Sequence, residues 1–74
     1  SVRESRRILE LVTHARHRGV SIIFITHNVY QVHEVADRLV VLERGQKIAD
    51  LLKKDSTPGQ IIEIIATGKV ERLK

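Results

Sequence analysis

The tripeptide Thr26-His27-Asn28 is the part of the sequence best placed to do chemistry. It closes an apolar, β-branched run over residues 20–26 and precedes a stretch with helical periodicity. We expect it at the carboxyl end of a buried strand, where ligands bind in open α/β sheets because backbone amides and helix N-termini converge there. An imidazole at that place can donate a hydrogen bond to a phosphate or position a water molecule. By position alone a structural histidine is the more frequent case, and both interpretations stay open at this point.

The other ionisable residues form no recognisable active site. His14, His17 and His33 lack the HExxH spacing or any similar ligand pair, so no metal site is expected. The sequence has no cysteine, no paired carboxylates, no Ser-His-Asp set and no glycine-rich phosphate loop. His27 is therefore the candidate site residue.

The basic residues near the start could indicate a nucleic-acid surface, since the net charge is +4 and five arginines lie in residues 3–18. However, Glu4 and Glu10 interrupt the positive run, and no aromatic residues are interleaved with it for base stacking. We therefore expect a solvated helix face and no nucleic-acid partner.

The elements that position His27 follow from the spacing of apolar residues. Ser1 and Glu4 have the spacing of a capping box, and the apolar stripe that follows predicts a helix over residues 2–18, ended by Gly19. Residues 20–26 predict a strand covered on both faces, because the run is almost continuously apolar. The 74 residues do not supply the neighbouring strands and helices that such a strand needs, so we expect part of the sheet to be missing from this chain.

The region after His27 predicts a short helix and then a hairpin. Asn28 and Gln31 have capping-box spacing at the start of a helix over residues 29–37. Strands over residues 39–42 and 47–51 should then pair in antiparallel fashion around a turn that contains a glycine, Gly45.

The last predicted element is a helix that begins at Thr57-Pro58-x-Gln60 and runs to about Thr67, where Gly68 stops it. The predicted order is helix, strand, helix, strand, strand, helix, which is an α/β fold with a helical crossover. Residues 1–68 form its body, and residues 69–74 form a charged tail.

Length and composition exclude several classes of protein. The chain has about half the length of a typical ~150-residue domain, and its hydrophobic content of 42% is typical of globular proteins rather than disordered ones. The longest purely apolar run is Ile22–Ile25, far below the ~20 residues of a membrane span, and no signal segment opens the chain. A soluble chain is expected.

Three stretches of this sequence, residues 19–28, 35–42 and 44–48, resemble the C-terminal part of ABC transporter ATP-binding subunits, which are P-loop NTPases. In that family a hydrophobic strand ends in Thr/Ser-His, a short helix follows, and an Ala-Asp-Arg strand and a Gly-Lys type hairpin come next. All of these stand here in order, within a match that covers about residues 1–67. The Thr-His-Asn form, the long opening helix and the Thr-Pro-x-Gln-Ile final segment most resemble the carbohydrate-uptake branch.

The resemblance assigns a role to His27. It would be the switch histidine of the H-loop, a catalytic and ATP-binding residue that contacts the γ-phosphate and helps to hold the attacking water and the dimer interface. Thr26 and Asn28 would be the strand end and the helix cap, and Ser1 would fall at or just after the D-loop. The resemblance also implies ATP and Mg²⁺, a second ATP-binding domain, a membrane permease, a location at the cytoplasmic face of the plasma membrane, and a sugar as the imported solute.

The sequence also departs from the family pattern. It has no GxxxxGK(S/T) loop, no Q-loop, no LSGGQ signature and no Walker B carboxylates. We therefore expect the chain to be the C-terminal fragment of a longer subunit that follows the D-loop, and expect that alone it neither binds ATP tightly nor hydrolyses it. The alternative is a stand-alone α/β interaction module whose basic helix is the contact surface.

Overall fold

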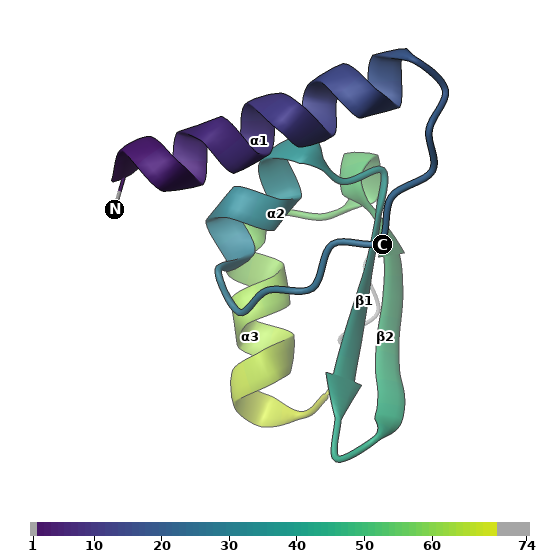
Figure 1. Ribbon diagram of the computed structural model, residues 1–74. Coiled ribbons are helices and arrows are strands. Elements are labelled where there is room, and N and C mark those ends of the chain that lie inside the picture. The colour runs from purple at the N-terminus through teal and green to yellow at the C-terminus, as the bar shows by residue number, and fades with distance from the viewer. Residues whose placement is uncertain (1, 70–74) are drawn as a thin grey trace. The chain divides into compact units, whose positions relative to one another are not determined.

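The computed structural model of the chain describes residues 2–69. Figure 1 shows the helices and strands of these residues. The chain divides into two compact units, and the boundary between them in the sequence falls between Val35 and Ala36. The first unit contains the helices α1 (Val2–His17) and α2 (Val29–Val35). The second contains the strands β1 (Arg38–Glu43) and β2 (Gln46–Leu52), the short 3-10 helix η1 (Lys53–Asp55) and the helix α3 (Pro58–Thr67).

The predicted opening helix is confirmed as α1. None of its residues is buried, and its half-buried side includes Leu9, Val12 and Ala15. The helix ends where the sequence predicts, because Gly19 takes a positive φ of 81° and the N–H of Val20 donates to the carbonyl of Ala15 at 3.0 Å. This is the Schellman arrangement, in which a glycine beyond the helix end lets two late carbonyls find donors. The predicted capping box at the start lies outside the described residues, because it needs Ser1.

The strand predicted over residues 20–26 is not formed. The segment is neither helix nor strand, and the side chains of Ile23 and Ile25 are each 91% exposed, whereas Phe24 between them is half-buried. A strand requires a neighbour to complete its ladder of N–H and C=O groups, and β1 and β2 of the described part pair with each other. The observed order is therefore helix, helix, strand, strand, helix.

The hairpin of the second unit has the predicted strands and turn. β1 and β2 are antiparallel, with Glu43 opposite Gln46, so that Arg44 and Gly45 form a two-residue turn. Both turn residues have positive φ, 49° and 78°, which is the pattern of the type I′ turn that suits the twist of paired strands. The register shifts by a bulge after Val41.

The helix α3 covers one face of this hairpin and completes a small core. Thr57 Oγ1 accepts from the N–H of Gln60 at 3.2 Å, and Gln60 Oε1 accepts from the N–H of Thr57 at 2.8 Å, so the predicted capping box is confirmed. Gly68 closes the helix in the left-handed conformation, also as predicted. The buried hydrophobic residues of the described chain come from these three elements: Leu39, Val41, Ala49, Ile61 and Ile64.

The connection between β2 and α3 holds an element that the sequence did not predict. η1 is followed by Ser56, whose hydroxyl donates to the carbonyls of Leu52 at 3.0 Å and Lys53 at 3.2 Å. Ser56 is the buried polar residue of the described chain, and these bonds satisfy its hydroxyl.

The described chain is a small α/β structure of three α-helices and a two-stranded sheet. Within residues 2–69, no helix is both long and apolar enough to span a bilayer. Only Lys69 of the predicted charged tail over residues 69–74 is described, so the rest of that prediction lies outside the described residues.

Candidate functional site

His27 lies in the first unit, between residues 20–26, which form neither helix nor strand, and α2, and its side chain is exposed. The backbone around it is fixed by the residues on either side. Thr26 Oγ1 accepts a hydrogen bond from the N–H of Asn28 at 3.1 Å, so the bond spans His27. The imidazole is therefore exposed to solvent at a hydrogen-bonded turn. His27 precedes a helix, as the sequence predicts, but the strand predicted before it is not formed.

Asn28 is the cap of α2, as predicted. Its side-chain Oδ1 accepts from the N–H of Gln31 at 3.1 Å, and its carbonyl accepts from the N–H of Val32 at 3.1 Å. The reciprocal half of the predicted capping box differs, because Gln31 Nε2 donates to the carbonyl of Ser5 in α1 at 3.5 Å. The glutamine side chain thus connects the two helices of the first unit.

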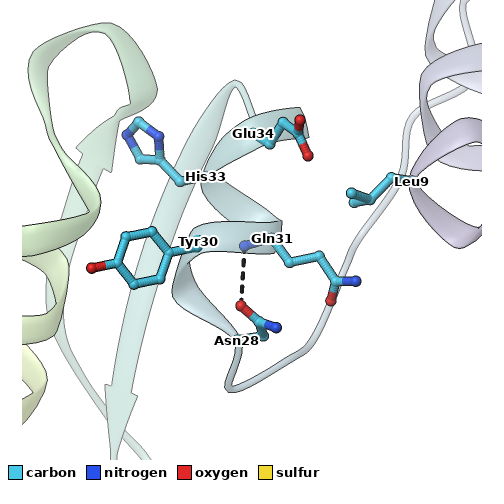
Figure 2. Close-up of a pocket in the computed structure, with 6 residues that line it drawn as sticks. All are labelled: Leu9, Asn28, Tyr30, Gln31, His33 and Glu34. Carbon is cyan, nitrogen blue, oxygen red and sulfur yellow. Dashed lines mark hydrogen bonds between the residues drawn. The ribbon is translucent and has the colours of Figure 1, made fainter. Parts of the chain in front are cut away.

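Figure 2 shows an open pocket beside this cap, lined by Leu9 of α1 and by Asn28, Tyr30, Gln31, His33 and Glu34. Tyr30 and His33 project from one side of α2, whereas Gln31 and Glu34 project from the other side, toward Leu9. Ligand sites are typically formed by polar groups that converge on one volume, and here the polar groups diverge. The pocket therefore adds no second set of reacting groups to His27.

The remaining histidines do not assemble into a metal centre in the described residues. His14 and His17 line a second open pocket together with Arg6, Glu10 and Glu34, where both signs of charge are mixed. Within residues 2–69, no group of three or more His, Cys, Asp or Glu side chains is arranged to hold a metal ion. The expectation that this chain binds no metal remains a prediction.

The second unit contains an ion-pair cluster that the sequence did not reveal. Arg38 Nε donates to Asp50 Oδ1 at 2.7 Å and its Nη2 donates to Oδ2 at 2.5 Å, while Lys47 Nζ lies 3.3 Å from the same Oδ2. The hydrogen bond from Arg38 is the main cause that lowers the pKa of Asp50 to about 2, and Lys47 lowers it further. The same pairing raises the pKa of Arg38. Because these side chains join β1 to β2 across one face of the hairpin, the cluster is structural.

Comparison with known proteins identifies the family. The chain is 41% identical over 73 residues to a xylose/arabinose import ATP-binding protein from Sulfolobus acidocaldarius, an alignment that covers 95% of this chain and 29% of the relative. It is 38% identical over 68 residues to a fructose import ATP-binding protein from Rhizobium meliloti, with 92% of this chain and 26% of the relative covered. A ribose import ATP-binding protein from Shigella dysenteriae serotype 1 is 34% identical over 65 residues, which are 88% of this chain and 13% of the relative.

No family model and no solved structure matches the chain. The chain spans less than a third of the length of each of these relatives. The resemblance noted in the sequence is nevertheless confirmed, because the alignments cover about nine-tenths of this chain and all three relatives are import ATP-binding proteins. The chain belongs to the ABC transporter ATP-binding proteins, and the relatives that it matches serve sugar import.

Proposed function

We propose that this chain is the C-terminal segment of the ATP-binding subunit of an ABC importer for a sugar, and that it supplies the switch histidine, His27. The observation that carries the proposal is the similarity over about nine-tenths of the chain to three import ATP-binding proteins that are each named for sugars. In the complete subunit, ATP hydrolysis drives uptake of the solute across the membrane.

The chemistry of His27 suits this role. Catalysis of phosphoryl transfer consists mainly of positioning and electrostatic stabilisation, so an exposed imidazole can act by donating a hydrogen bond to a γ-phosphate oxygen and by orienting the attacking water. The sequence has no glycine-rich phosphate loop, and among the described residues no group of three or more His, Cys, Asp or Glu side chains could hold Mg²⁺. We therefore assign the phosphate-binding loop, the metal ligands and the general base to the part of the subunit that this chain does not span. The chain alone is then inactive and binds ATP only weakly.

The exposed segment over residues 20–26 supports the same proposal. Ile23 and Ile25 are β-branched, suited to a sheet, and almost completely exposed in this chain. In the complete subunit we expect this segment to become a strand between strands from the rest of the chain. That pairing would bury both isoleucines and place His27 at the carboxyl edge of the sheet.

The partners of the complete subunit follow from the proposed function. Two ATP-binding domains associate as a dimer beneath a membrane permease, so the subunit is peripheral at the cytoplasmic face of the plasma membrane. The basic face of α1 stays solvated and binds no nucleic acid.

The reading frame upstream of Ser1 gives the first test. It should encode a Walker A loop, a Q-loop, a signature motif and Walker B carboxylates in one polypeptide with this chain. A frame without these motifs would refute the proposal and favour the alternative, a small α/β interaction module.

A kinetic test addresses His27 in the full-length subunit. We expect His27→Ala to leave ATP affinity largely intact and to lower the rate of ATP hydrolysis, because the lost donor acts on charge that develops in the transition state. His17→Ala is the matched control, because His17 is also exposed but lies at the end of α1. Hydrolysis that is unchanged by His27→Ala would refute the assigned role.

A further inference from the structure

The hydroxyl of Thr26 makes a contact that neither the sequence pattern nor the assigned role of His27 requires. Its Oγ1 accepts from the N–H of Asn28 at 3.1 Å, so one side chain closes a turn with His27 at its centre. Threonine hydroxyls stabilise turns of this kind by replacing a backbone acceptor. A strand-end residue selected only for its extended conformation would not need this oxygen, since valine has the same shape and the same preference.

The far side of the turn is anchored to α2. Asn28, whose N–H is held by Thr26, also caps α2 through its side chain and begins the helical hydrogen bonds through its carbonyl. The N–H of the peptide bond between His27 and Asn28 therefore belongs to a set of hydrogen bonds that leads from the Thr26 side chain into the helix. These bonds restrict the backbone on either side of His27, although the imidazole itself is exposed.

We infer that Thr26 is a positioning residue for His27, which holds the imidazole in the orientation needed for ATP hydrolysis. The inference rests on the proposed function of His27. A catalytic group that is misplaced by about 1 Å loses much of its effect on the rate. The loss of a hydrogen bond that positions the imidazole should therefore lower turnover without a comparable loss of substrate binding.

The test is a double-mutant cycle in the full-length subunit, with ATP hydrolysis and ATP affinity measured for each variant. Thr26→Val keeps the β-branched shape and removes the acceptor, and Thr26→Ser keeps the acceptor. We expect Thr26→Val to lower kcat about tenfold with KM for ATP unchanged, and Thr26→Ser to retain most of the activity. In the His27→Ala background, Thr26→Val should cause no further loss, because its effect acts through the imidazole.

Thr57→Val is the matched control, since the Thr57 hydroxyl also accepts from a backbone N–H, that of Gln60 at 3.2 Å, but at the start of α3 in the second unit. We expect it to lower stability and leave kcat unchanged. The inference is overturned if Thr26→Val leaves kcat unchanged while His27→Ala lowers it, or if Thr26→Val lowers kcat equally with and without His27. A normal kcat for His27→Ala would instead refute the proposed role of His27, and the inference with it.

Discussion

Two adjacent isoleucines of α3 give a test of the hairpin core in the second unit. Ile61 is 3% exposed and packs in the core with Leu39, Val41 and Ala49, whereas Ile62 on the same helix turn is 39% exposed. Replacing either isoleucine by alanine removes the same three carbon atoms and changes helix propensity by the same amount. The difference between the two variants therefore reports burial alone.

The magnitude follows from the atoms removed. Three buried methyl or methylene groups at about 0.8 kcal/mol each give about 2.4 kcal/mol for Ile61→Ala, before any cavity contribution. For Ile62→Ala we expect about 1 kcal/mol or less, because part of its side chain is already in water. Since about 1.4 kcal/mol corresponds to a factor of ten, local opening of the hairpin should become about 50-fold more frequent in the first variant and less than about tenfold in the second.

Amide hydrogen exchange of β1 and β2 in the full-length subunit measures this opening. The exchange of amides in both strands should accelerate together, because the strands open as one unit with α3. An equal increase of amide exchange in Ile61→Ala and Ile62→Ala would refute the reasoning, since it would mean that the face of α3 that carries Ile61 does not pack against the hairpin.

Three further predictions concern other parts of the chain. The pKa of Asp50 is lowered from 3.8 to about 2, so its pairing with Arg38 stabilises the fold fully above about pH 4 and is lost as the pH falls toward 2. Asp50→Asn should therefore reduce the dependence of stability on pH between pH 4 and 2 in acid unfolding, and an unchanged dependence would contradict the pairing. Gly59→Ala should stabilise α3 by about 0.5–1 kcal/mol in thermal unfolding, because the added Cβ meets only a hydroxyl at 3.9 Å. Gly68→Ala should instead destabilise the chain by about 1 kcal/mol, because Gly68 has φ +69° and the added Cβ would lie 3.2 Å from a glutamate carboxylate oxygen. A change of the same sign in both variants would refute this reasoning. Ile23→Lys should sharply reduce the yield of folded full-length subunit while Arg16→Lys does not, and normal folding of Ile23→Lys would refute the proposed burial of residues 20–26.

The second unit was predictable because its signals are local. Gly45 at a two-residue turn and the Thr57-Pro58-x-Gln60 cap each specify backbone geometry within four residues, and both appear as expected. The Arg38–Asp50 pair was missed because it depends on how β1 and β2 are registered around a bulge, which local spacing does not determine.

The first unit was predicted less completely because its central segment depends on distant partners. Residues 20–26 have the composition of a strand, but composition does not supply the neighbouring backbone that a ladder requires. The capping role of Asn28 and the place of His27 just before a helix were predicted from order and residue type, but the buried strand expected before His27 is not formed. The hydrogen bond from Asn28 to the Thr26 hydroxyl was not predicted, because threonine at a strand end was explained by β propensity alone.

The exposed segment over residues 20–26 also has a composition that favours self-association. Its seven residues carry no charge and no proline and are rich in β-branched side chains, which is the signature of segments that form cross-β fibrils. Two nearly fully exposed isoleucines, in a segment that pairs with no strand of the described residues, offer a template to the same segment of another molecule. Under the proposed function, a truncation that retains residues 20–26 without the strands proposed to cover them leaves this segment open to amyloid-like self-association, which competes with folding.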